Sequence, residues 1–137
     1  MKQKYLLNIF TFCLFSITSF GQSAGDIAFT GYNTDGNKDF AIVVLADISA
    51  STTIYFTDDE TTGVGSPSAL AGSEGTITWN TGANIIKAGT IVVFTDLDSD
   101  ANANFGASIG TITRSGSFNL SGSKDGIIAF IGTDSST

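Results

Sequence analysis

A run of carboxylate and amide side chains at alternate positions, within residues 96–104, is the part of the sequence best suited to chemistry. Oxygen side chains at this spacing can wrap a hard cation, and Ca²⁺ takes about six to eight oxygen ligands. We therefore predict a Ca²⁺ site with these ligands: Asp96, Asp98, Asp100 and Asn102. The loop departs from the EF-hand pattern at Ala101, where that pattern has glycine, and at Ala107, where it has a bidentate glutamate. A solvated polar loop held by Asx turns is the alternative.

Two other acidic segments carry weaker forms of this signal. Residues 33–39 place oxygen side chains at alternate positions, but their glycine is misplaced for an EF-hand loop, and turn formation accounts for them without an ion. Asp58, Asp59 and Glu60 are adjacent carboxylates, which repel one another unless water or a shared cation intervenes. We expect these three side chains to be solvated.

The residue types exclude most catalytic mechanisms. The chain has no histidine, and its single cysteine, Cys13, falls in the leader predicted below. Ser-His-Asp and Cys-His catalysis and histidine-ligated zinc are therefore excluded from the exported chain. A carboxylate pair of the glycosidase type remains, but the two glutamates, Glu60 and Glu74, fall in one loop, and no apolar surroundings are predicted to raise their pKa. We predict that the chain is not an enzyme, with a glycosidase fragment as the least favoured alternative.

Aromatic side chains offer carbohydrate binding as a further option. Tyr55 falls on the opposite face of its predicted strand from Ile54 and Phe56, so we expect it to be exposed. With Tyr32, near the end of another predicted strand, it would form a platform for sugar rings. The alternation around Trp79 places that side chain in the core instead.

Residues 1–21 have the features of a signal peptide. Lys2 and Lys4 precede an uncharged and mostly apolar stretch, and small residues before Gln22 suit cleavage after Gly21. The stretch is short for a membrane span, which needs about 20 apolar residues. We expect a mature chain of residues 22–137, secreted or on the cell surface, without membrane insertion and without disulfides.

The mature chain would be strongly acidic. Two of the six basic residues lie in the leader, and 13 acidic residues face the remaining four: Lys38, Lys87, Arg114 and Lys124. This balance disfavours nucleic acid, whose phosphates require clustered basic residues, and anionic membranes. We expect an extracellular protein or a glycan as the partner.

Short apolar runs between turn residues predict an all-β fold. The run at residues 39–45 is expected to be a central strand buried on both faces. Further strands are expected at 25–33, 53–57, 76–79, 91–94 and 126–131, with a weak one near Ile109 and Ile112 and with Phe118 and Leu120 as core anchors. The runs at 40–45, 91–94 and 127–131 are the candidates for inner strands. No helical spacing occurs, so we predict a β-sandwich of about seven strands, with a β-barrel as the alternative that the strand pattern leaves open.

The order of these motifs resembles the lamin-tail-like domains of secreted bacterial proteins. The motifs are Gly25-Asp-Ile-Ala-Phe, Asp39-Phe-Ala-Ile-Val-Val-Leu, Ile86-Lys-Ala-Gly-Thr-Ile-Val-Val-Phe and Phe118-Asn-Leu-Ser-Gly-Ser-Lys-Asp-Gly-Ile. The resemblance covers most of the mature chain and implies an immunoglobulin-like β-sandwich that serves as an accessory module of a larger extracellular protein. The third strand departs from the family, which has Gly-Trp-x-Leu where this chain has Ile54-Tyr-Phe-Thr57.

These observations lead us to expect a secreted, non-catalytic accessory or adhesion module. Ca²⁺ would stabilise it if the 96–104 loop binds the ion, and a carbohydrate-binding module is the alternative function. Because the apolar run at 127–131 comes last, we expect that it is an edge strand or that more polypeptide follows Thr137.

Overall fold

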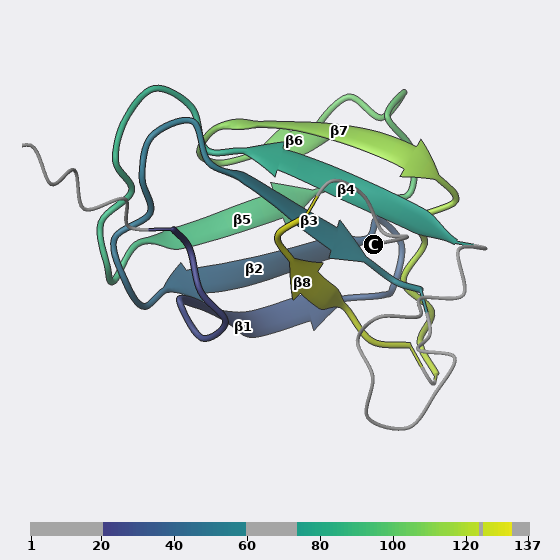
Figure 1. Ribbon diagram of the computed structural model, residues 1–137. Coiled ribbons are helices and arrows are strands. Elements are labelled where there is room, and N and C mark those ends of the chain that lie inside the picture. The colour runs from purple at the N-terminus through teal and green to yellow at the C-terminus, as the bar shows by residue number, and fades with distance from the viewer. Residues whose placement is uncertain (1–20, 60–73, 124, 133–137) are drawn as a thin grey trace, which may run out of the picture.

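The computed structural model describes residues 21–59, 74–123 and 125–132. The predicted leader up to Phe20, Glu60, most of the loop that follows it, Lys124 and residues 133–137 lie outside these ranges. The described chain contains eight strands and no helix, and so no helix long and apolar enough to cross a membrane (Figure 1).

The strands form two antiparallel four-stranded sheets, stacked in two layers (Figure 1). The first sheet has the order β1-β2-β5-β6, with bounds Ile27–Asn33, Asp39–Val44, Ile91–Thr95 and Gly106–Ala107. The second has the order β7-β4-β3-β8, with bounds Thr111–Gly116, Gly75–Asn80, Thr53–Thr57 and Ile128–Phe130. The predicted all-β, sandwich-like class is confirmed, and the weak strand near residues 109–112 is replaced by two strands, β6 and β7.

The central run at 39–45 is not buried on both faces, contrary to the prediction. Phe40, Ile42 and Val44 of β2 are buried, whereas the residues between them are partly exposed. The run in β5 alternates in the same way, with Ile91 and Val93 exposed. The reason is that the other sheet covers only one face of each strand, as is common for antiparallel sheets.

The core lies between the sheets and is built around aromatic rings. Phe40 of β2 stacks on Phe94 of β5, with ring centroids 4.5 Å apart, and packs against Phe56 of β3 at 4.9 Å. Trp79 of β4 meets Phe94 edge-on at 5.3 Å, and its indole N–H donates to the Ile109 carbonyl at 2.8 Å. The predicted core position of Trp79 is confirmed, and the predicted anchors Phe118 and Leu120 are also buried.

Gly75, the first residue of β4, allows the segment after β7 to reach the core. A Cβ at Gly75 would lie 1.9 Å from the backbone nitrogen of Phe118 and 2.4 Å from its Cα. Since those atoms belong to the backbone, the contact cannot be relieved by a change of rotamer. Glycine is therefore required where Phe118 enters the core.

The substitution Gly75→Ala is expected to lower the free energy of unfolding by about 3 kcal/mol, the upper part of the usual range for overpacking. The matched control is Gly31→Ala in β1, where a Cβ would meet nothing within 4 Å. Urea denaturation of both variants measures the difference. Equal stability of the two variants would contradict the close packing of Phe118 on β4.

The two long sides of the fold differ. On one side, β6 leads through a short turn into β7 and so links the sheets. On the other side, the edge strands are β1 and β8, and each has one strand neighbour within the described part of the chain. Among the described residues, β8 lies at a sheet edge, which is one of the two outcomes expected for the last strand, and it is not an inner strand there. The side between β1 and β8 is where the two layers remain open.

Candidate functional site

The two segments with alternating oxygen side chains lie side by side, which the sequence did not predict. The backbone N–H of Asp96 donates to the Asp39 carboxylate at 2.9 Å, and the Asn37 amide donates to the Asp96 carboxylate. The N–H of Leu97 donates to the Lys38 carbonyl at 2.8 Å. Asp96 is buried, with a left-handed backbone (φ 55°) that Asp tolerates better than most residues. These bonds join the start of β2 to the end of β5.

The four predicted Ca²⁺ ligands do not form a calcium cage as they are arranged here. The Asp98 carboxylate accepts a bond from the Asn102 side-chain amide at 2.9 Å, and Asp100 is exposed. Across the described residues, no group of three or more acidic side chains converges in a way that would hold a metal ion. The Asn102 amide also donates to the Asp96 carbonyl at 3.3 Å, so its N–H₂ group, and not its oxygen, faces the other predicted ligands. The Ca²⁺ site therefore stays a prediction.

If the 96–104 loop binds Ca²⁺, a concentration of ten times Kd would add about 1.4 kcal/mol of stability and raise Tm by several degrees. Thermal melts in millimolar Ca²⁺ and in EDTA measure this shift. Asp98→Asn should abolish it, whereas Asp35→Asn, which removes an exposed carboxylate from the neighbouring segment, should leave most of it. An unchanged melt of the unmodified chain would rule out the site.

Asp58 and Asp59 are buried, with 3% and 4% exposure, and so are not solvated as predicted. The two oxygens of Asp58 accept the backbone N–H groups of Gly75 and Asn119 at 3.0 and 2.6 Å. Asp59 accepts the N–H of Glu74 at 3.0 Å. Hydrogen bonds of this kind satisfy a buried carboxylate. Asp58 thus ties the end of β3 to the start of β4 and to the segment after β7, which is a structural role.

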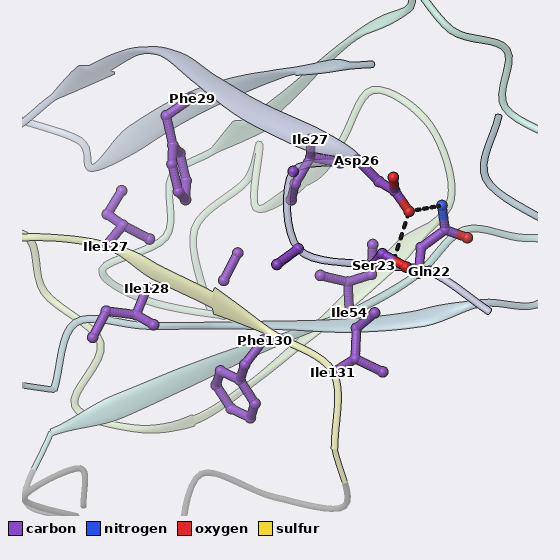
Figure 2. Close-up of a pocket in the computed structure, with 13 residues that line it drawn as sticks. Gln22, Ser23, Asp26, Ile27, Phe29, Ile54, Ile127, Ile128, Phe130 and Ile131 are labelled. Atoms are coloured by element: carbon purple, nitrogen blue, oxygen red, sulfur yellow. Dashed lines mark hydrogen bonds between the residues drawn. The ribbon is translucent and has the colours of Figure 1, made fainter. Parts of the chain in front are cut away.

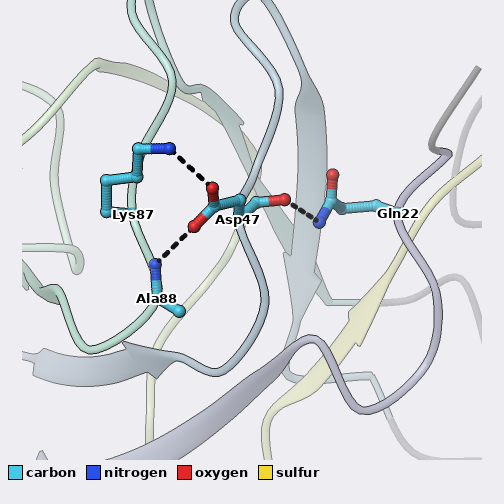
Figure 3. A network of polar contacts seen from close by, with 4 residues as sticks. All are labelled: Gln22, Asp47, Lys87 and Ala88. Atoms are coloured by element: carbon cyan, nitrogen blue, oxygen red, sulfur yellow. Dashed lines mark hydrogen bonds and ion pairs between the residues drawn. The ribbon is translucent and has the colours of Figure 1, made fainter.

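An exposed polar network fixes the connections at the opposite end of the sheets (Figure 3). The Lys87 ammonium contacts the Asp47 carboxylate at 2.7 Å, and the Ala88 N–H donates to its other oxygen at 3.0 Å. The bond from Lys87, together with the one from Ala88, lowers the pKa of Asp47 below its usual 3.8. Gln22 donates to the Asp47 carbonyl at 3.4 Å. The network is open to solvent, and it links the segment after β2 to the segment before β5 and to Gln22.

The two tyrosines of the predicted sugar platform lie on different sheets. Tyr32 belongs to β1 of the first sheet and is strongly exposed. Tyr55 belongs to β3 of the second sheet, faces away from the core, and stacks on Phe130 of β8 with ring centroids 5.2 Å apart and planes 16° apart. The Tyr55–Phe130 pair is therefore the aromatic surface available on the outer face of the second sheet.

Hydroxyl side chains surround this aromatic pair. Across the second sheet, Tyr55 is paired with Thr78, which is paired in turn with Thr113. The neighbouring rows on the same face consist of threonine, serine and asparagine: Thr53, Asn80 and Thr111 on one side, and Thr76 and Ser115 on the other. Thr57, which is in register with Thr76, is buried, and its hydroxyl donates to the Gly75 carbonyl at 2.7 Å. Because residues paired in register share a face, these strands present an uncharged, hydroxyl-rich outer surface.

An apolar groove of about 610 Å³ lies along the open side of the fold (Figure 2). One wall comes from β1 and the residues before it, and the other from residues 127–131. Figure 2 shows Ile127 near Phe29 toward one end, and Ile131 toward Ser23 and Asp26 at the other. Ile54 of β3, which is buried, also lines the groove. We refer to this feature as the β1/β8 groove.

Phe29 is the central aromatic side chain of the β1/β8 groove. Phe29 is 41% exposed, and its ring packs edge-on against those of Phe40 and Phe56, with ring centroids 5.7 and 6.1 Å apart. The register pairs Phe29 with Ile42, a core residue, so its side chain faces inward and is exposed because nothing described covers it. Fixed rings with one open face are typical anchors of binding sites.

The β1/β8 groove has one ionisable side chain among its lining residues, Asp26. The Asp26 carboxylate accepts the Ser23 N–H at 2.6 Å and the Gln22 amide at 3.2 Å. It has no second acid or base beside it in the lining with which to share proton transfer. Glu74, one of the two candidate catalytic glutamates, lies outside the groove lining and is exposed; Glu60 lies outside the described residues.

No family model, curated protein or solved structure matches the chain.

Proposed function

We propose that the chain is a non-catalytic binding module of an extracellular protein, of the accessory or adhesion type. The observation that carries this proposal is the β1/β8 groove, where rigid apolar side chains lie open beside two sheet edges. Its lining offers shape and apolar contact but no pair of groups for proton transfer or nucleophilic attack. Such a surface is suited to holding a partner rather than to transforming one.

Export and domain type belong to the same proposal. The leader-like residues 1–21 and the absence of cysteine from residues 22–137 favour a secreted or surface-attached chain that needs no disulfide. Two stacked antiparallel sheets are compatible with the immunoglobulin-like sandwich that the lamin-tail-like resemblance implies. In this proposal Ca²⁺ in the 96–104 loop would be a stabilising ion rather than a reactant.

The test is binding of residues 22–137 to an array of purified extracellular proteins and glycans. Phe29→Ala should weaken the binding at least about tenfold, because buried aromatic anchors dominate interface energies. The control is Val93→Ala, since Val93 is similarly exposed (39%) on the outer face of the same sheet. Turnover of a fluorogenic glycoside panel that is lost in Glu74→Gln would contradict the non-catalytic proposal.

Carbohydrate binding is the second candidate function, and the Tyr55–Phe130 pair supports it. Aromatic faces stack on sugar rings, and the threonine rows beside Tyr55 could donate and accept hydrogen bonds with sugar hydroxyls. The face described here is uncharged, which suits a neutral glycan.

If this second function holds, a glycan array should show binding that falls by at least about tenfold in Tyr55→Ala. Tyr32→Ala, on the other sheet, serves as the control and should bind normally. Equal loss in both variants, or binding that survives Tyr55→Ala, would count against the outer face of the second sheet as the sugar surface.

A further inference from the structure

We propose that the β1/β8 groove binds an extended segment of a separate polypeptide, which pairs with the free edge of β8 as an added strand and carries basic residues at its ends. This inference rests on the binding-module function proposed above. It narrows that function to one partner chemistry: alternating apolar residues in β conformation, flanked by lysine or arginine. Edge pairing combined with side-chain pockets is a recurring mode of peptide recognition.

The free edge of β8 is suited to pairing. Residues 128–130 pair with β3 on one side, in regular register from Thr57 to Tyr55. The segment Ile127-Ile-Ala-Phe-Ile131 contains neither charge nor proline, and these are the usual protections of an exposed edge. Within the described chain, no strand occupies its other side.

The opposite edge, β1, is less suited to pairing. Its ladder with β2 is irregular between Phe29 and Gly31, where the register shifts. Such bulges twist an edge and interrupt regular pairing. We therefore assign the added hydrogen bonds to β8 and assign to β1 the apolar wall, through Phe29 and Ile27.

The length of the groove wall at residues 127–131 matches that of a five-residue strand. Alternate residues of an added strand point to the same side, with about 6.6 Å between them, so three apolar side chains in a five-residue segment would face the groove. Residues 127–131 form a wall of matching length. The intervening residues of the added strand would point outward on the side of the Tyr55–Phe130 surface and can be polar.

The charges at the two ends of the groove select a basic partner. Asp26 lies at one end (Figure 2). At the other end, Ile127 also lines a separate small pocket, together with Asp125, Tyr32 and Leu120. Among the described lining residues of both features, these two aspartates are the only charged side chains, so an occupant with positive ends is favoured and a second copy of this acidic chain is disfavoured.

The probe is the synthetic peptide Lys-Val-Thr-Val-Thr-Val-Lys, titrated into residues 22–137 by calorimetry. It should bind, and the same peptide with glutamate at both ends should bind about tenfold more weakly. N-methylation of alternate backbone amides separates edge pairing from apolar insertion, because alternate N–H groups point to opposite sides of a strand. Methylation of one alternate set should abolish binding, and methylation of the other should preserve it.

Ile131→Lys places a charge in the groove lining, one residue after the end of β8, and should reduce peptide affinity at least about tenfold. Ile85→Lys is the matched control, because Ile85 is equally exposed (56% against 54%) and lies away from the groove. Thermal melts verify that both variants fold. Because both side chains are exposed, a loss of peptide affinity in Ile131→Lys alone could not be explained by misfolding.

The inference is overturned if the lysine-flanked peptide does not bind at millimolar concentration, if both methylated sets bind like the parent, or if glutamate ends bind equally well. It is also overturned if the chain self-associates in sedimentation and Ile131→Lys abolishes that association, since the occupant would then be a second copy. A different result is that the peptide fails to bind while the chain still binds a partner on the protein and glycan array in a way that depends on Phe29. That result would overturn the strand-pairing inference and leave the proposed binding-module function in place.

Discussion

The burial of a cluster of aromatic rings between two sheets is the constraint on which this fold depends. Phe40 contacts rings contributed by both layers, among them Phe56 and Phe118 from the second layer and its connections. Each fully buried aromatic side chain contributes about 1.5–3 kcal/mol relative to an exposed one. No disulfide can form after Cys13, so apolar contact between the sheets holds the described layers together. Each sheet therefore needs an apolar face only on the side that meets the other sheet.

Some of the acidic side chains stabilise the fold by accepting backbone hydrogen bonds, and others lie on the surface. Asp58 accepts the backbone N–H groups of Gly75 and Asn119, and a bond between Asp39 and Asp96 joins the ends of β2 and β5. Buried donors and acceptors are costly when they are left unpaired, so short carboxylates that accept backbone bonds stabilise tight connections without metal or disulfide. Part of the negative charge is therefore internal and hydrogen-bonded.

Local pattern predicted most of the fold, because strand alternation is a local property. The strand positions, the inward side of Trp79, and the anchors Phe118 and Leu120 all follow from period-two patterning and turn residues. The same reasoning overstated burial in residues 39–45, since an apolar run does not reveal whether one or two layers cover a strand. The burial of Asp58 was not predicted because its partners, Gly75 and Asn119, are remote in sequence.

The candidate site was less predictable than the fold. The β1/β8 groove depends on which strands become edges, and this is decided by pairing between remote segments, such as that of Thr57 in β3 with Ile128 in β8. The apolar residues at 127–131 and the alternation around Phe29 were visible, but the sequence could not show that they face each other across an open side. Likewise, Tyr32 and Tyr55 have the same chemistry, and only the sheet order separates them.

The single tryptophan provides the most direct measurement of the central claim, because Trp79 is fully buried against Phe94 where the layers meet. The fluorescence of folded residues 22–137 should be blue-shifted relative to free tryptophan and resistant to quenching by iodide, and both properties should disappear on unfolding in urea. Emission like that of a solvated indole, quenched by iodide in the native protein, would contradict an aromatic core closed between two sheets.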